Sequence, residues 1–135
     1  MISPPKDSIN LFICDDFRKE AEGKLSLLGI YFNKVISIPK NSDGMISSLC
    51  FVVTLNGQPG DYIISFEILK NDKSEHVMFR TPKEETLNID DDASGGMYAA
   101  RLGGIKMFDE QHGDYLFKLK INDTVYVFQF KLLVQ

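Results

Sequence analysis

The sequence predicts an all-β protein: a two-layer antiparallel β-sandwich, immunoglobulin-like or C2-like, with little helix. Three observations predict it. About nine or ten short runs show the period of two that places one face of a strand on a core. Turn residues separate these runs at the spacing typical of sandwiches. No segment has sustained helical periodicity, and residues 16–21 are the best candidate for a helical turn.

Length and composition are those of one globular domain. The chain has 135 residues, of which 44% are hydrophobic and 25% are charged. A chain of this size buries a core without disulfides or metals to hold it. Residues 1–7, which include two prolines, are expected to be a frayed leader. The net charge is −4 and no window concentrates basic residues, which argues against nucleic-acid binding.

Nothing in the sequence predicts export or membrane insertion. The N-terminal residues lack the basic region and apolar run of a signal peptide. The apolar runs are far shorter than the ~20 residues that span a bilayer. We therefore expect a cytoplasmic protein without a membrane partner.

The first third of the chain predicts three strands. Residues 9–14 are apolar apart from Asn10, as in a strand that is covered on both faces. Residues 15–23 are a charged connection, and residues 24–32 are a second strand. Asn33 turns the chain into a short strand over residues 35–38, which Pro39 ends because proline has no amide hydrogen to donate. Residues 41–44 have the composition of a loop.

The middle of the chain predicts five further strands, over residues 48–55, 61–70, 75–80, 86–89 and 98–108. Asn-Gly and Asn-Asp pairs mark the clearest turns between them. A longer loop is expected over residues 90–96. Gly103 and Gly104 interrupt the last of these strands, and paired glycines in such a pattern mark a bulge or a close approach of backbone.

Residues 113–134 carry the most regular pattern. Large apolar residues alternate in two runs, which are Tyr115, Phe117, Leu119 and Ile121, then Tyr126, Phe128, Phe130, Leu132 and Val134. Asn122-Asp123 lies between them and is turn chemistry, since both residues tolerate positive φ. We predict a β-hairpin with its aromatic face on another sheet and with Tyr115 buried. The segment 60–62 repeats the Gly-Asp-Tyr of 113–115, and both resemble the tyrosine corner of immunoglobulin-like sandwiches.

The two cysteines, Cys14 and Cys50, each lie in an apolar run. We predict free, buried thiols, as is usual in a chain without an export signal. An inter-sheet disulfide of the immunoglobulin type is the alternative. That bridge usually packs against a tryptophan, and the chain has none.

Candidates for catalysis or metal binding are few. His76 and His112 are the only histidines, and neither lies near a cysteine in the sequence. The common nucleophile, zinc and phosphate-loop motifs are absent. We predict that the protein is not an enzyme and has no cofactor and no metal; the acidic turn around His112 is interpreted as solvated.

Two alternatives stay open. One is a sandwich that binds calcium or a small ligand, if Asp15 and Asp16 meet the acidic loop Asp90-Asp91-Asp92 at one end of the fold. The other is a hydrolase with an unfamiliar site.

The opening of the chain resembles that of a known family. The residues that carry the resemblance are Cys14-Asp15-Asp16-Phe17-Arg18-Lys19-Glu20 and Gly23-Lys24-Leu25-Ser26-Leu27-Leu28-Gly29-Ile30-Tyr31, with Gly113-Asp114-Tyr115 near the end. They resemble an uncharacterised family of small bacterial proteins. The resemblance covers the two ends better than the middle. It implies a bacterial or phage source and a β-sandwich, and it brings no catalytic residue.

The leading hypothesis is a non-enzymatic interaction module that binds a protein partner. The candidate contact residues are Asp15, Asp16, Phe17, Arg18 and Glu20, in the charged connection after the first strand. Binding residues tend to lie on loops held by a rigid scaffold, and charges around an aromatic residue suit a protein partner. The competing interpretation makes Phe17 a plug beneath the loop, with the charges merely solvated.

Overall fold

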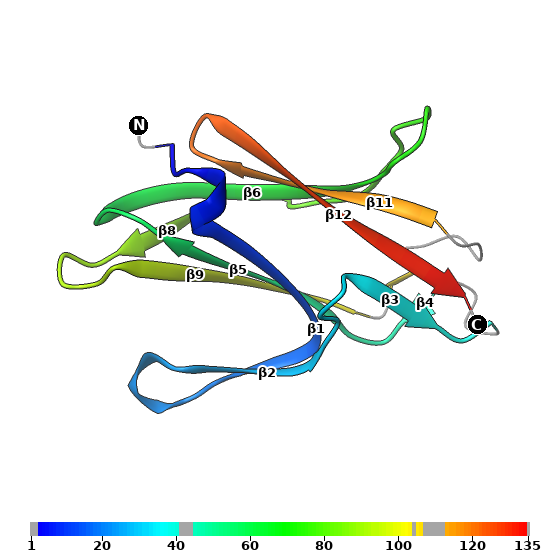
Figure 1. Ribbon diagram of the computed structural model, residues 1–135, viewed down its shortest axis with the longest axis horizontal. Coiled ribbons are helices and arrows are strands. Elements are labelled where there is room, and N and C mark those ends of the chain that lie inside the picture. Colours follow the sequence, from blue (N-terminus) through cyan, green and yellow to red (C-terminus); the bar gives the residue numbers. More distant parts are fainter. Residues whose placement is uncertain (1–2, 41–44, 104, 107–112, 135) are drawn as a thin grey trace.

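The structure, a computed structural model, describes residues 3–40, 45–103, 105–106 and 113–134. It confirms the predicted fold class: two sheets pack face to face, and the chain is nearly all β (Figure 1). The helices among the described residues are two 3-10 turns, η1 (Lys6–Ser8) and η2 (Ala21–Gly23).

The first sheet has four antiparallel strands in the order β2-β1-β5-β9. Their bounds are β1 (Ile9–Lys19), β2 (Leu25–Ile30), β5 (Leu49–Asn56) and β9 (Gly95–Leu102). β5 is buried along most of its length on both faces. Its inner face meets the second sheet, and its outer face is covered by an arm of the first sheet that is described below.

The second sheet follows the order β3-β12-β11-β6-β7, with β8 also paired to β6. Its strands are β3 (Val35–Ile38), β6 (Gly60–Lys70), β7 (Val77–Arg80), β8 (Glu85–Ile89), β11 (Gly113–Ile121) and β12 (Thr124–Val134). β3 pairs with β12 in parallel, whereas the other described pairings are antiparallel. A separate pair joins β4 (Met45–Ile46) to β10 (Ile105–Lys106).

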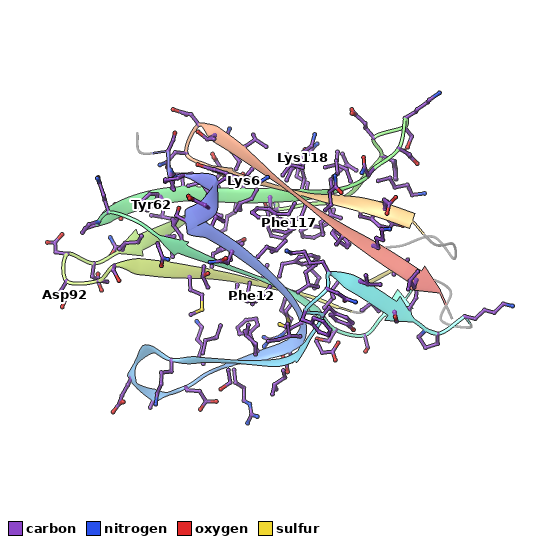
Figure 2. The ribbon with its side chains drawn as sticks, viewed as in Figure 1. Lys6, Phe12, Tyr62, Asp92, Phe117 and Lys118 are labelled. Atoms are coloured by element: carbon purple, nitrogen blue, oxygen red, sulfur yellow. The ribbon has the colours of Figure 1, made fainter. Side chains whose placement is uncertain are left out.

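The core lies between the two sheets and is centred on Phe51 of β5. Its ring stacks on Phe117 of the second sheet with 5.0 Å between centroids, and lies 5.8 Å from Phe130 and 6.2 Å from Phe66. Figure 2 shows Phe117 between the layers and Lys118, the next residue of β11, on the opposite face. The alternation of the sequence therefore sorts side chains between core and solvent, as predicted.

The turn chemistry predicted for the β11–β12 hairpin is confirmed. Asn122 has a φ of 54°, and its side-chain oxygen accepts a hydrogen bond from the Ile63 amide at 2.9 Å. The tyrosine of the repeated Gly-Asp-Tyr segment also behaves as a corner. Tyr62 is buried, and its hydroxyl donates to the Gln58 carbonyl oxygen at 2.6 Å. Both contacts tie a turn to a neighbouring segment of backbone.

Of the glycines around β9, Gly103 lies as the sequence predicts and Gly95 does not. A Cβ on Gly103 would lie 2.5 Å from the Ser47 carbonyl oxygen, which confirms a close approach of backbone there, while Gly104 lies outside the described residues. The sequence predicts Gly95 in the loop over residues 90–96, yet β9 begins at this residue. A Cβ there would lie 2.8 Å from the Leu55 carbonyl oxygen, so glycine is required by the neighbouring strand.

Residues 1–7 were predicted to be a frayed leader, and the described part of that segment lies against β12. Pro4 is buried, and its carbonyl oxygen accepts a hydrogen bond from the Tyr126 hydroxyl. The Lys6 ammonium donates to the Val127 carbonyl oxygen at 3.1 Å and lies over the Phe128 ring. The start of the chain is thus tied to the second sheet before β1 enters the first.

Removing the Tyr115 ring should destabilise the fold. The ring is 2% exposed and stacks on Phe130 with 5.5 Å between centroids. We expect Tyr115→Ala to lower the free energy of unfolding by ~3 kcal/mol or more, the usual effect of truncating a buried aromatic residue. Lys120→Ala, at an exposed position of the same strand, is the matched control and should change it by less than about 0.5 kcal/mol. Denaturant unfolding measures both, and a loss under about 1 kcal/mol for Tyr115→Ala would contradict the packing.

Candidate functional site

Four of the five predicted contact residues, Asp15, Asp16, Phe17 and Arg18, lie on a strand and not in a loop, and Glu20 follows that strand. β1 continues to Lys19, and its second half pairs with β2, so that Asp16 faces Leu28 and Phe17 faces Leu27. We call this hairpin, residues 15–30, the arm. Figure 1 shows it leaving the two layers and folding back beneath β5 and β9. Its charged side chains interrupt the apolar alternation of β1, which is why the sequence was interpreted as a connection.

The arm is fastened to the far strand of its sheet by Arg101 of β9. The guanidinium donates to the Asp16 carboxylate at 2.8 and 3.1 Å and to the Phe17 carbonyl oxygen at 2.9 Å. It also lies over the Phe17 ring, 4.3 Å from the centroid, in a cation–π contact. The hydrogen bond from Arg101 lowers the pKa of the Asp16 carboxyl group. Two of the predicted residues therefore hold the arm in place.

The arm covers the outer face of the first sheet, where the two thiols lie. Cys14 and Cys50 are opposite each other on β1 and β5, and both are fully buried and free. This confirms the prediction. The side chains packed around them come from the arm and from β9, and are Phe17, Leu25, Leu27, Met97 and Ala99. Burial raises the pKa of the Cys14 thiol to about 11, which keeps it protonated at neutral pH.

The other predicted contact residues, Asp15, Arg18 and Glu20, take no part in the hydrogen bonds of Arg101. Asp15 lies where β1 bends into the arm, and its carboxylate accepts a hydrogen bond from the Tyr31 hydroxyl at 2.7 Å. Gly29 makes room for it, since a Cβ there would lie 2.4 Å from the carboxylate. Burial raises the pKa of Tyr31 to about 12. Arg18 and Glu20 are exposed. The arrangement favours the interpretation of Phe17 as a plug, set under an arm instead of a loop.

The acidic residues of the calcium alternative do not meet. Asp16 is held by Arg101 near the end of β9, whereas the Asp90-Asp91-Asp92 turn precedes that strand. At about 3.3 Å per residue, Gly95 and Arg101 are roughly 20 Å apart. Figure 2 shows Asp92 at one extremity of the molecule. No group of three or more potential metal ligands forms within the described ranges, and His112 lies outside them.

A different site emerges on the flank where β1 and β12 lie. A groove of about 410 Å³ is lined there by residues 9–12 of β1, by Ile30, Tyr31, Phe32 and Lys34, and by Phe128 of β12. Alternate side chains of a strand point to opposite faces, so four consecutive residues can line one groove only along the edge of the strand. We call this site the flank groove.

Large apolar side chains around the flank groove are exposed. Phe32 is 90% exposed, Ile30 44% and Phe12 36%. Such residues occur singly on most surfaces, but here three of them border one groove. One indirect signal of this site is present in the sequence, since Phe32 is an aromatic residue directly before the turn at Asn33. That Phe12 and Phe128 also line the groove depends on strand order and could not be predicted.

Comparisons with known proteins add no family. No protein-family model and no curated protein sequence matches the chain. Among solved structures, the periplasmic chaperone SfaE is similar with a TM-score of 0.47 and 15% identity, over 76% of this chain and 53% of the chaperone. The Pseudomonas fluorescens alkylpurine DNA glycosylase AlkC, bound to DNA containing an abasic site analogue, is similar with a TM-score of 0.42 and 15% identity, over 73% of this chain and 27% of the glycosylase. The chain thus spans about half the length of the chaperone chain.

The described residues also bear on the membrane prediction. Among them, no helix has both the length and the apolar composition needed to cross a bilayer.

Loss of the Arg101 side chain should loosen the arm. We expect Arg101→Ala to speed the labelling of Cys14 and Cys50 by an aromatic disulfide reagent several-fold, because the thiols react only when the arm opens. Arg18→Ala, which removes the same charge from an exposed position of the arm, should leave the rate unchanged. Equal rates in all three proteins would show that Arg101 does not fasten the arm.

Proposed function

We propose that the protein is a non-enzymatic interaction module that binds a protein partner through the flank groove. The observation that carries the proposal is the exposed Phe32, Ile30 and Phe12 around one groove at an open sheet edge. Aromatic and aliphatic residues that fill pockets supply most of the free energy of binding at protein interfaces. The proposed partner surface is therefore the flank and not the arm, where Asp16 and Phe17 contact Arg101.

The rigidity of the surroundings supports this choice. The floor of the groove is β1, which pairs with β5 over residues 9–14 and belongs to the packed core. One wall is Phe128, half-buried on β12, and Lys6 lies over its ring. An exposed side chain on these strands, such as Phe12, can bind without the ordering of a loop, which lowers the entropy cost of association.

The two cysteine thiols are placed where they contribute to packing. Cys14 and Cys50 lie beneath the arm, and burial raises the pKa of both thiols. A thiol reacts as the thiolate, so such residues are chemically inert in the folded protein. The cytoplasmic location and the bacterial or phage origin expected from the sequence stay predictions.

A photo-crosslinking amino acid placed at position 32 tests the proposal in cells. We expect a defined protein to be crosslinked from position 32 and not from position 125, where Val125 is 54% exposed on the outer face of the second sheet. The purified partner should then bind the wild-type protein directly. Phe32→Asp should weaken that binding tenfold or more, the size of a hot-spot loss, whereas Val125→Asp should not.

Stability controls make the result decisive. Because Phe32 is 90% exposed, Phe32→Asp should leave the melting temperature nearly unchanged. The same crosslinked proteins at positions 32 and 125, or a purified partner that binds Phe32→Asp as tightly as the wild type, would count against the flank groove as the partner surface.

A further inference from the structure

We infer that the partner segment is an extended peptide that adds a strand to the open edge of β1, with apolar residues at alternate positions and a carboxylate facing Lys34. The inference rests on the proposed function and names the chemistry of its ligand. It is carried by the direction of the main-chain groups in β1, by the apolar lining of the flank groove and by its charge.

The main chain of β1 presents unpaired groups to the groove. In an antiparallel strand, successive residues direct their N–H and C=O to opposite sides. Tyr31 donates its amide to the Ile13 carbonyl oxygen at 2.8 Å, and Ile9 donates its own to the Lys6 carbonyl oxygen. The N–H and C=O groups of the odd-numbered residues here therefore point away from β5. Leu11, midway between them, directs its N–H and C=O into the groove, and no described residue bonds either group.

The position of β2 shows where the added strand would lie. β2 pairs with this same side of β1, but only from Cys14 onward, and the chain leaves the edge after Tyr31. The edge over residues 9–12 is therefore a continuation of the line that β2 occupies. It is about 10 Å long, enough for a segment of three or four extended residues. Contact over so short a length predicts transient binding.

The edge of β12 is a poorer acceptor. Its odd-numbered residues face the flank, as the bond from Lys131 N–H to the Lys34 carbonyl oxygen shows. The Val127 carbonyl oxygen already accepts from the Lys6 ammonium. β3 covers the far end of the strand, from Lys131 onward. Gln129, between these contacts, also has main-chain groups that no described residue bonds. The flank groove, however, is lined by four consecutive residues of β1 and by Phe128 of β12, so a peptide in the groove would pair with β1.

The lining determines which side chains the peptide needs. Residues of an added strand that point between the sheets would lie beside Leu11, Ile9 and Phe128, so they must be apolar. Residues on the other face would lie beside Asn10 and Phe12, where polar and apolar side chains are both accommodated. A period of two in the peptide satisfies both faces, as in strand addition to other exposed edges.

The charge of the groove favours an acidic segment. Lys34 is the charged residue among those that line it, and its ammonium forms no ion pair within the described part of the chain. A carboxylate on the peptide would therefore find an unpaired ammonium beside the turn.

The test uses a phage-displayed decapeptide library selected on the wild-type protein, with Phe32→Asp for counter-selection. We expect enriched peptides with apolar residues at alternate positions and an aspartate or glutamate at one end. Synthetic copies of one such peptide, each N-methylated at a single amide, then report on main-chain pairing. Binding should fall tenfold or more at alternate amides only, because each such change leaves a buried carbonyl oxygen without its donor.

A charge swap tests the predicted contact with Lys34. Lys34→Glu should weaken the acidic peptide about threefold, as expected for a partly exposed ion pair, and a peptide with lysine in place of its acidic residue should recover that loss. Lys120→Glu, on the outer face of the second sheet, should leave the affinity for both peptides unchanged.

Three outcomes would overturn the inference. They are a library without enrichment, a selected peptide that tolerates N-methylation at every amide, and a concentration-dependent dimer of the protein whose formation Phe32→Asp abolishes, which would make a second copy the occupant. In the first two cases the crosslink from position 32 can still identify a protein partner. The proposed function would then stand while strand addition fails.

Discussion

Two spacings that are nearly constant in β proteins determine which strands can pair on the flank of this molecule. Sheets packed face to face lie about 10 Å apart, while hydrogen-bonded strands lie about 4.8 Å apart. The stack of Phe51 on Phe117 fills the space between the layers and holds the sheets at the larger separation. The parts of β1 and β12 that β2 and β3 leave unpaired are edges of different sheets on the same flank, so they cannot pair with each other. Their free edges need a different cover, or they stay open.

The chain covers parts of this flank and leaves one part open. Residues 3–8 bond to the start of β12, and β3 pairs with its end. β2 pairs with β1 only from Cys14 onward, beside the bend at Asp15 where the strand leaves the sandwich to form the arm. β1 thus belongs to both the sandwich and the arm. Its first half belongs to the core, and its second half covers the thiols under the Arg101 contact. The edge between these covers is the flank groove.

The parts of the fold that depend on local pattern could be predicted from the sequence. The β11–β12 hairpin follows from a period of two and from an Asn-Asp turn, and Asn122 has the positive φ that this turn requires. The second strand of the arm, β2, was predicted as part of residues 24–32. The first strand could not be predicted, because Asp15, Asp16 and Arg18 interrupt its apolar period. Strand order and the parallel pairing of β3 are long-range properties. The flank groove follows from them, so Phe12 and Phe128 gave no signal that they share a site.

The most direct measurement is the hydrogen exchange of single amides along β1 in the free protein, followed by NMR. Asn10 and Phe12 direct their amides toward β5, whereas Leu11 directs its amide into the flank groove. If the edge is open, the Leu11 amide exchanges at least tenfold faster than the amides on either side of it, since only paired amides require an opening event. The selected peptide then slows its exchange. Equal protection of all three amides in the free protein would show that the edge of β1 is already paired and has no place for an added strand.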